Sequence, residues 1–495
     1  MASRASRASR ASRTPRTGLS VAVLADSDTR WKWGALTARR LVPDHGELTG
    51  YLLRGRATPT ARQLGEVGVR ADRLAEVTCP EFLAALERER PDVVVLALVG
   101  GAVQAVLHGV RALWPEPAAR PVLVTGYVGV VYEKLADGLL LRHGADLVLA
   151  NSRHDAERFR AVYEGVGAAA DSVTETALPF LAEAGPGGPH RSQGAAPSRA
   201  LRVVFAVQPS VPETRKDRAY LLGRAAGHAR LHPDREVLVK LRSRPGEHTT
   251  HLEEQPYQRL AERIPGGLPP NCRLAYGNMG EVLDGTGLLV TVSSTAALES
   301  LHRGIPTAVL TDLGIREALG NHHFLGSGCL ASWDQLDSGL LPQPAPSWLA
   351  AHGVPAAHGV PAAPAPTASD TPGPGPDGPR PDGPGAGAPH TAGPAAPPDP
   401  YAAARGRVAE LAARSSLPPV DPYYTRTTAP GYLPGILARQ HLDPDGTPLP
   451  GTLRDTAGES RLRRLLRRQL REAARGAYRH GVQRVAPVIR RLGEL

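Results

Sequence analysis

The chain has 495 residues, of which 41% are hydrophobic and 4% aromatic, and its formal net charge is +10. This length predicts about three folding units. The positive charge lies at the two ends, since residues 1–16 carry +5 and residues 461–495 carry +9, which leaves −4 for the residues between them. A nucleic-acid-binding fold carries its basic patch on the globular part, so we expect no nucleic-acid partner.

The cysteines and the apolar runs give the expected compartment. Cys79, Cys272 and Cys329 lie far apart and provide neither a disulfide framework nor metal-ligand spacing. Three such cysteines suit a reducing cytoplasm. The N-terminal stretch lacks the apolar core of a secretory signal, and no run of about 18 apolar residues predicts a membrane-spanning helix. We therefore expect a cytoplasmic protein.

The first part of the chain alternates short apolar runs with helical patterns. Residues 1–18 form a basic, low-complexity segment that is either a disordered arm or an over-long gene start. Apolar runs follow at 20–25, 48–53, 92–98, 121–125 and 146–150. Helical patterns lie between them at 30–41, 80–90 and 100–113. Alternation of this kind predicts a parallel sheet covered on both faces, which we expect to form a Rossmann-like domain at 19–185.

A second series of the same design follows a Gly/Pro/Ser-rich linker at 186–200. The predicted strands are 201–207, 236–241, 272–276, 288–292 and 306–310. The predicted helices are 214–230, 295–303 and 315–320. We expect a second Rossmann-like domain at 201–341.

The C-terminal part divides into two segments of different composition. Residues 342–400 are rich in Pro, Ala and Gly and cannot bury enough apolar surface to fold, so they predict a disordered insert. Residues 401–495 predict a basic helical extension that begins with a helix at 402–413. The stretch 460–491 has leucines at helical spacing with arginines opposite. Peripheral contact with an anionic membrane and docking on the protein itself are both open for this helix.

A turn of small hydroxyl residues carries the clearest chemistry. A predicted strand ends at Val292, and Ser293, Ser294 and Thr295 lead into the next helix. Free amides at a helix N-terminus attract anions, and the hydroxyl groups add donors. Glu299 lies one helical turn further on, where it can accept hydrogen bonds from a ribose. A simple helix cap is the alternative explanation of the turn.

Two other strand ends of the second domain add polar groups. Lys240 and Arg242 end the strand at 236–241, and Gln208 follows the strand at 201–207. Carboxyl ends of parallel strands meet at one sheet edge, where such folds bind ligands. Cations at that edge suit a phosphate, although solvated surface cations would have the same sequence.

The strand ends of the first domain predict acceptor contacts. Asp26 and Asp28 follow the first strand, and a carboxylate there can serve as the general base for a sugar hydroxyl. A capping Asp beside core tryptophans is the alternative. The residues expected to contact the acceptor are Trp31, Trp33, Gly126, Tyr127 and Gly129.

The arrangement at 288–312 resembles the donor-binding half of GT-B glycosyltransferases, in which a small-residue turn, a helix with Glu and Gly-x-Pro recur. The double serine is similar to bacterial polysialyltransferases and capsule Kdo-transferases. This resemblance covers about 19–340 and implies an α/β fold of two Rossmann-like domains facing each other across a cleft. It implies that the 293–295 turn holds the donor phosphate and that Glu299 holds the ribose. In those families His-Pro follows a Lys-Leu strand end, whereas Arg242-Ser243 stands here.

Four segments together, 24–34, 126–152, 204–251 and 288–329, resemble an uncharacterised actinobacterial family of glycosyltransferases. The resemblance implies transfer of a sugar from a nucleotide-activated donor to an unknown glycan or lipid-linked acceptor, as in polysaccharide biosynthesis. We expect no cofactor and no metal, with cations and the helix dipole in place of a metal. Asp26-Ser27-Asp28 is the one segment that speaks against this.

Two other functions remain open. A nucleotide-sugar 2-epimerase shares the fold, and a non-catalytic nucleotide-sugar-binding protein could retain it. Other nucleotide enzymes are disfavoured, because the glycine pattern of dinucleotide-binding folds and the P-loop are both absent from the sequence.

Overall fold

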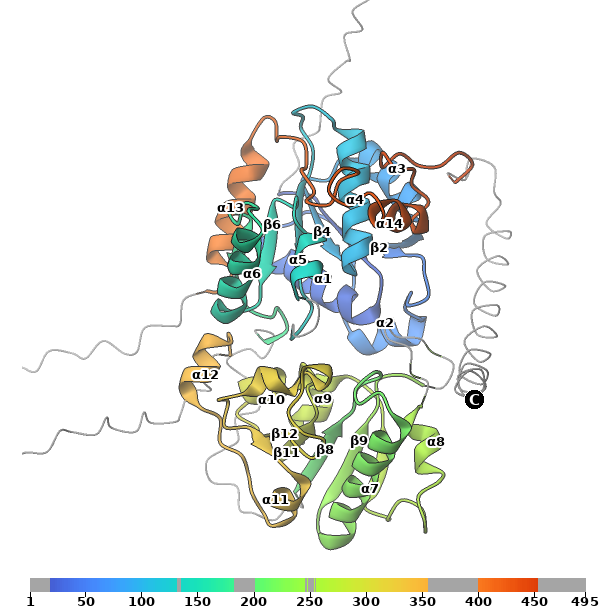
Figure 1. Ribbon diagram of the computed structural model, residues 1–495, viewed down its shortest axis with the longest axis vertical. Helices are drawn as coiled ribbons and strands as arrows, with labels where there is room; N and C mark the ends of the chain where they lie inside the picture. The colour runs from blue at the N-terminus through green and yellow to red at the C-terminus, as the bar shows by residue number, and fades with distance from the viewer. Residues whose placement is uncertain are drawn as a thin grey trace, which may run out of the picture.

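Two parallel sheets form the frame of the protein (Figure 1). The structure is a computed structural model that describes residues 18–130, 135–181, 201–244, 247, 253, 255–354 and 399–452. Most of the predicted arm, the linker at 186–200 and the basic helix at 460–491 lie outside these residues, as does 355–398.

The first sheet has seven strands in the order β3-β2-β1-β4-β5-β6-β7, and every strand pair is parallel. Strand β1 lies next to the central strand, β4, and its Val21 pairs with both Leu48 and Val93. The strands are β1 (Val21–Ala25), β2 (Leu48–Leu53), β3 (Arg73–Val77), β4 (Val93–Ala97), β5 (Val122–Gly126), β6 (Leu147–Ala150) and β7 (Val173–Glu175).

Helices cover both faces of this sheet. The α3, α4, α5 and α6 helices pack on one face, and α1 packs on the other. Ser152 caps α6, because its side chain accepts the Asp155 amide. The helices are α1 (Asp28–Leu41), α2 (Ala61–Val67), α3 (Cys79–Glu89), α4 (Gly100–Leu113), α5 (Leu135–Leu140) and α6 (Arg153–Gly165).

The second sheet repeats the design with six parallel strands in the order β10-β9-β8-β11-β12-β13. Its strands are β8 (Arg202–Ala206), β9 (Glu236–Lys240), β10 (Cys272–Ala275), β11 (Leu288–Thr291), β12 (Thr307–Leu310) and β13 (Leu330–Ala331). Its α-helices are α7 (Arg215–Leu231), α8 (Tyr257–Ala261), α9 (Met279–Asp284), α10 (Ala296–His302) and α11 (Trp333–Asp337). Two 3-10 turns, η2 (Glu317–Leu319) and η3 (Asn321–Phe324), follow β12.

Each strand predicted from an apolar run is present, and the two-domain α/β fold is confirmed. The central strands are almost wholly buried, as expected of a parallel sheet covered on both sides. Three strands were not predicted: β3, β7 and β13. The first of these is an edge strand with mostly exposed residues, and the other two have only three and two residues. The helix predicted at 315–320 is the short turn η2.

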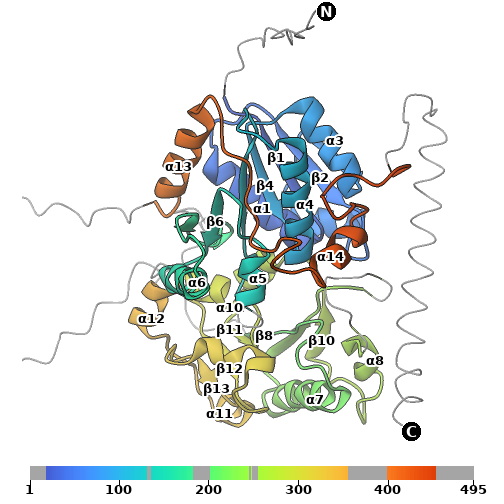
Figure 2. The ribbon, with the colours of Figure 1, turned by 45° about the horizontal axis from the view of Figure 1, so that its top comes forward.

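A short helix, α12 (Pro346–Ala351), corrects the prediction that residues 342–400 are without structure throughout. Trp348 and Leu349 anchor it, since both are buried in a cluster that includes Leu298 of α10 and Leu178 of the first domain. Figures 1 and 2 place α12 between α6 and the second sheet. Buried apolar side chains, among them Val354, thus hold this part of a Pro- and Ala-rich segment against the rest of the protein.

The last described residues return to the first domain (Figure 2). This C-terminal strap, residues 399–452, contains the predicted helix at 402–413, α13 (Ala402–Ala413), and α14 (Leu433–Arg439). The two helices lie on opposite faces of the first sheet, α13 beside α1 and α14 beside α4. Between them the Leu417 amide donates to the Ala118 carbonyl at 2.8 Å.

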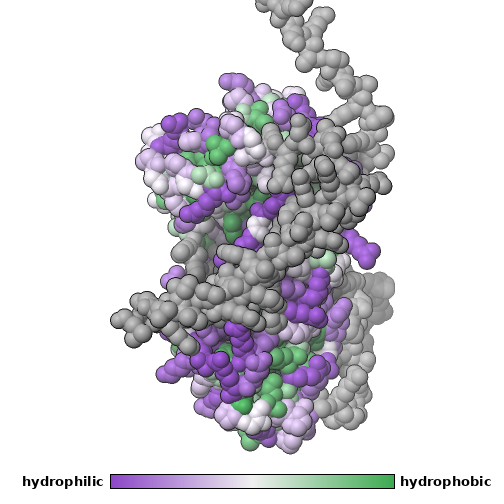
Figure 3. Space-filling model, turned by 90° about the vertical axis from the view of Figure 1, so that its right-hand side faces the viewer, coloured by the Kyte–Doolittle hydropathy of each residue, from purple (hydrophilic) through white to green (hydrophobic). Residues whose placement is uncertain are grey.

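Hydrophilic and hydrophobic side chains are interspersed on the visible parts of both lobes in Figure 3. Within the described part of the chain, no helix combines the length and apolar character needed to cross a bilayer.

Candidate functional site

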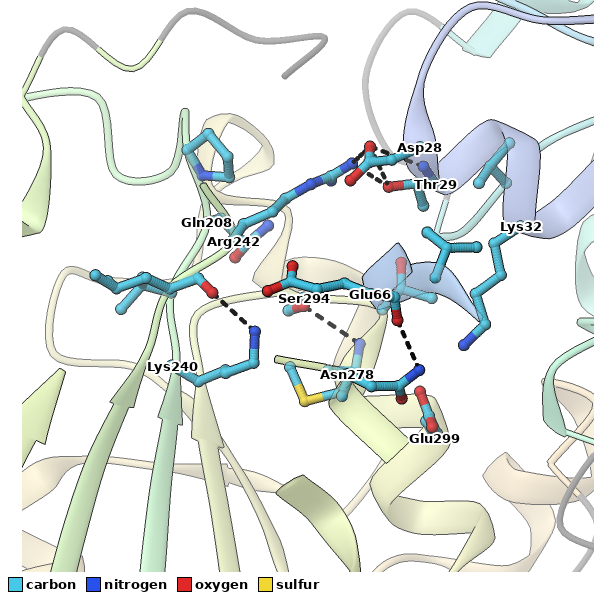
Figure 4. Close-up of a pocket in the computed structure, with 18 of the residues that line it drawn as sticks. Asp28, Thr29, Lys32, Glu66, Gln208, Lys240, Arg242, Asn278, Ser294 and Glu299 are labelled. Atoms are coloured by element: carbon cyan, nitrogen blue, oxygen red, sulfur yellow. Dashed lines mark hydrogen bonds and ion pairs between the residues drawn. The ribbon is translucent and has the colours of Figure 1, made fainter. Parts of the chain in front are cut away.

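A cavity of about 350 Å³ lies between the two domains, where the carboxyl ends of both sheets meet (Figure 4). This volume is within the range of small-molecule sites, about 300–1,000 Å³. The first domain contributes the polar residues Asp28, Thr29, Lys32, Gln63 and Glu66. The second domain contributes Gln208, Ser210, Lys240, Arg242, Asn278, Ser293, Ser294, Thr295 and Glu299.

Lys240 ends β9 and reaches the cavity from a buried position, with 6% of the residue exposed. Its Nζ donates to the Leu241 carbonyl at 2.8 Å. Burial lowers the pKa of Lys240 to about 8, because the ammonium loses solvation, and the charge of Arg242 acts in the same direction. An anion in the cavity would favour the charged ammonium.

Arg242 extends from the second domain across the cavity to the first (Figure 4). Its Nη2 lies 2.8 Å from Asp28 Oδ1, and it also contacts the Thr29 hydroxyl. Burial alone would raise the pKa of the Asp28 carboxyl. The charge and hydrogen bonds of Arg242, together with the Thr29 amide, outweigh burial and hold that pKa below its usual value.

The hydroxyl turn lines the cavity, but most of its amides already have partners. The amides of Ser293, Ser294 and Ala296 donate to Gln208 Oε1, Thr291 Oγ1 and Ser294 Oγ respectively. The expectation of several free amides at this turn is therefore wrong for these three. Since α10 has only seven residues, its dipole adds little. The hydroxyl groups of Ser294 and Thr295 and the nearby cations remain as donors that face the cavity.

The residues of this turn differ in what their side chains contact. Ser293 is 2% exposed, and its hydroxyl donates to the Leu319 carbonyl. Thr295 touches the first domain, where its Oγ1 accepts the Val130 amide at 3.4 Å. A Cβ on Gly129 would lie 2.3 Å from that same oxygen, so only glycine allows this approach. Gly129 therefore brings the two domains together beside the cavity.

Glu299 lies in the cavity wall, as the sequence predicted. It is 7% exposed, and its Oε1 is 3.3 Å from Arg303 Nη2. Gln208, also predicted, lines the same cavity and bonds to Ser293. The structure thus brings all the predicted donor-side residues to one cavity.

Asp26 lies outside the cavity lining, unlike Asp28. One of its oxygens accepts from Arg30 at 2.9 Å and the other accepts the Val99 amide at 2.9 Å. Because both oxygens are occupied within its own domain, the prediction of a base at this position is corrected to a structural role. Asp28 is the member of the pair that faces the second domain.

Trp31 and Trp33 belong to the core of the first domain, which corrects the prediction that they contact the acceptor. Trp31 and Trp33 are 0% and 1% exposed. The Trp31 ring lies against Gly50, and the Trp33 ring lies against Gly126, where an added Cβ would come within 2.9 Å of the indole. Glycines in the neighbouring strands therefore make room for two core indoles.

Gly126 and Tyr127 are likewise packing residues and do not line the cavity. The Tyr127 ring lies 4.1 Å from the Arg142 guanidinium carbon and 5.5 Å from the ring of Phe159. This corrects their predicted role in acceptor contact. In their place, Val128 and Val130 of the same loop reach the cavity.

Six polar cavity residues were not predicted: Thr29, Lys32, Gln63, Glu66, Ser210 and Asn278. Lys32 follows Asp28 by four residues, so the helical period could have placed both on one face. Glu66 had no such indication, because α2 was not predicted. Asn278 caps α9, and its Nδ2 donates to the Glu66 carbonyl across the domain boundary at 2.9 Å.

A possible ligand set for a metal lies elsewhere. Among the described residues, His228 and His232 of α7 and Asp337 of α11 offer atoms close enough to share an ion. His228 Nδ1 is 2.6 Å from the Asp337 carboxylate, and Arg235 donates to its Nε2 at 3.2 Å. Since both ring nitrogens have partners, hydrogen bonding explains this cluster. It lies near the C-terminal end of α7, away from the cavity.

Two Rossmann-like domains whose strand ends enclose one cavity define a GT-B-like fold. The family model described as "Putative glycosyltransferase (DUF6716)" matches residues 21–364, well over half of the chain, and the protein belongs to that family. A search of the curated proteins found no match.

Solved structures similar to this chain are distant in sequence. The S. aureus MnaA–UDP co-structure is 12% identical with a TM-score of 0.46, and the match covers 68% of this chain and 91% of that one. The UDP-GlcNAc 2-epimerase from Neisseria meningitidis bound to UDP-GlcNAc is 11% identical with a TM-score of 0.43, covering 68% and 94%. The spinosyn rhamnosyltransferase SpnG is 15% identical with a TM-score of 0.40, covering 65% and 88%. These likenesses do not separate epimerase from transferase activity.

Proposed function

We propose that this protein transfers a glycosyl group from a nucleotide-activated donor to a hydroxyl group of a glycan or lipid-linked acceptor. The observation that carries the proposal is the cavity between the domains, which combines two cations of the second domain with a carboxylate of the first. Membership of the glycosyltransferase family supports the same class of reaction.

The donor side of the cavity suits a nucleoside phosphate. Lys240 and Arg242 supply positive charge for the phosphates, and the hydroxyls of Ser294 and Thr295 add neutral donors. Glu299 supplies a carboxylate that can accept hydrogen bonds from the ribose hydroxyls. Charge and hydrogen-bonding capacity are therefore distributed along the cavity as a nucleoside diphosphate requires.

Asp28 is the proposed base. It removes the proton of the acceptor hydroxyl as that oxygen forms a bond to the anomeric carbon of the donor. The bond from this carbon to the phosphate oxygen breaks at the same time, and the leaving phosphate takes the electron pair. Lys240 and Arg242 stabilise the charge that develops on it.

Ligand-dependent thermal stability tests the donor half of the proposal. A panel of nucleoside diphosphates and nucleotide sugars should contain ligands that raise the melting temperature, because they bind only the folded protein. The shift should fall sharply in Lys240→Gln. It should persist in Lys216→Gln, which removes an exposed lysine outside the cavity. A panel without any stabilising member would contradict the proposal.

Product analysis tests the reaction class. With a stabilising nucleotide sugar, the wild-type protein should release the free nucleotide by transfer to an acceptor or slowly to water. Recovery of the nucleotide sugar epimerised at C2 would instead establish the 2-epimerase. Tight binding with neither product would establish a non-catalytic binding protein.

A further inference from the structure

One ion pair spans the cavity. Arg242 of the second domain pairs with Asp28 of the first at 2.8 Å, and both residues line the cavity (Figure 4). A second ion pair between the domains, Arg62 with Glu247, involves no cavity-lining residue. The Arg242–Asp28 contact therefore occupies the space where substrates are expected to react.

The two residues of this pair have competing tasks in the proposed reaction. Arg242 is needed by the donor phosphates, whose oxygens can take two of its N–H groups together. The N–H groups that face Asp28 and Thr29 are not free for that purpose. Asp28, for its part, cannot readily accept a proton while a guanidinium stabilises its charge.

The two side chains differ in exposure and in how they are held. The Asp28 side chain is 13% exposed and is held at the start of α1, where one oxygen accepts the Thr29 amide at 2.8 Å. The Arg242 side chain is 33% exposed and lies on the loop after β9. When the pair separates, the arginine is therefore the residue that moves.

Separation changes the basicity of Asp28. Burial of this carboxyl raises its pKa, and Arg242 is the main group that opposes burial. Once Arg242 has turned to another anion, burial dominates and the carboxylate becomes a better proton acceptor. The local bond to Thr29 keeps it in place.

We infer that Arg242 is a latch between the domains, which masks Asp28 in the empty protein and frees it when the diphosphate of a bound donor takes the guanidinium. This inference rests on the proposed function. It makes Arg242 a residue that reports donor occupancy to the base, in addition to binding the donor. Until a donor binds, the charge of Asp28 is neutralised by Arg242.

A binding experiment separates this latch from simple proximity. The wild-type protein has to break an ion pair before it binds a diphosphate, whereas the Asp28→Asn variant has no such pair to break. Calorimetry with inorganic pyrophosphate and with the nucleoside diphosphates of the panel should show tighter binding to Asp28→Asn, by about fivefold for a partly exposed pair. Asp26→Asn is the matched control. It removes a nearby carboxylate that does not pair with Arg242, and it should leave affinity within about twofold of wild type.

The decisive measurement is a double-mutant cycle. Arg242→Gln should weaken diphosphate binding, and adding Asp28→Asn to it should give no further gain, because the pair no longer exists. A gain of equal size in the presence and absence of Arg242 would overturn the latch, and so would equal affinities of wild type and Asp28→Asn.

These outcomes are distinguishable from failure of the proposed function. Diphosphate binding that shows the predicted coupling without any glycosyl transfer would remove the transferase and leave the latch. Glycosyl transfer by a protein that lacks this coupling would remove the latch and leave the transferase. If neither wild type nor Asp28→Asn binds any diphosphate, both proposals are wrong.

Discussion

The two domains share one fold but use their strand ends differently. In the second domain, residues at the ends of β8, β9 and β11 line the cavity. In the first, the ends of β1 and β5 are divided. Asp28, Thr29, Lys32, Val128 and Val130 line the cavity, whereas Asp26, Trp33 and Gly126 are engaged within their own domain. The sheet edge thus lines the cavity in the second domain and is divided between cavity and packing in the first, where Asp28 is the exception that forms an ion pair with a strand end of the other domain.

The largest expected effect tests that exception. Asp28→Asn should reduce glycosyl transfer by about 100- to 10,000-fold, the range typical of a lost general base. Diphosphate binding should persist. Initial rates at saturating donor measure this, with Asp26→Asn as the control that keeps most of its activity once its folding is verified. Comparable losses in both variants would place the chemistry elsewhere.

The next effect concerns packing in the first domain. Trp33→Ala should lower the free energy of unfolding by about 3–5 kcal/mol, because it empties a buried site. Urea denaturation measures the change, and Trp33→Phe should lose less. If Trp33→Ala left the stability unchanged but weakened the use of the acceptor, Trp33 would contact the acceptor as the sequence predicted.

The third effect concerns the charge of Lys240. With a pKa of about 8, the Lys240 side chain is mostly protonated at pH 7, and its positive charge is lost as the pH rises through 8. Affinity for pyrophosphate should therefore be weaker at pH 9 than at pH 7. Lys240→Gln should cost about tenfold to a hundredfold at pH 7, as for a lost hydrogen bond to a charged group. Lys240→Arg should flatten the pH dependence, and an identical dependence in that variant would exclude Lys240 as its source.

The smallest effect separates ribose from phosphate recognition. Glu299→Gln should weaken binding of a nucleoside diphosphate by about tenfold, ~1.4 kcal/mol. Inorganic pyrophosphate has no ribose, and its affinity should change little. Calorimetry with the two ligands side by side gives the comparison. Equal losses for both would move Glu299 to the phosphate region of the cavity.

The sequence predicted the structure well wherever a residue pattern repeats. It predicted poorly the positions whose role depends on contacts with distant residues. Long apolar runs predicted the central strands, because burial on both faces leaves a continuous signal. The edge strand β3 lacks that burial and was missed. Ser293 to Thr295, Lys240 and Arg242 were placed correctly because strand ends of one sheet share an edge.

The first-domain site was harder to predict. Asp26 and Asp28 have the same chemistry and follow the same strand, and only their partners in the folded protein distinguish them. Asp26 accepts hydrogen bonds within its own domain, whereas Asp28 pairs with Arg242 across the cleft. Trp31 and Trp33 are buried because Gly50 and Gly126 leave space in neighbouring strands, a pairing that no local pattern shows. Glu66 and Asn278 meet only when the domains come together.

The C-terminal strap has a consequence for how the chain is made. Its helices α13 and α14 cover opposite faces of the first sheet, and Leu433 and Leu437 are fully buried there. During synthesis the first domain emerges early but lacks this cover until residue 439 has left the ribosome. The second domain, all of whose strands precede residue 332, can complete its sheet sooner. We therefore expect the half that is translated first to finish folding last, and expect fragments that end before the strap to expose apolar surface and aggregate.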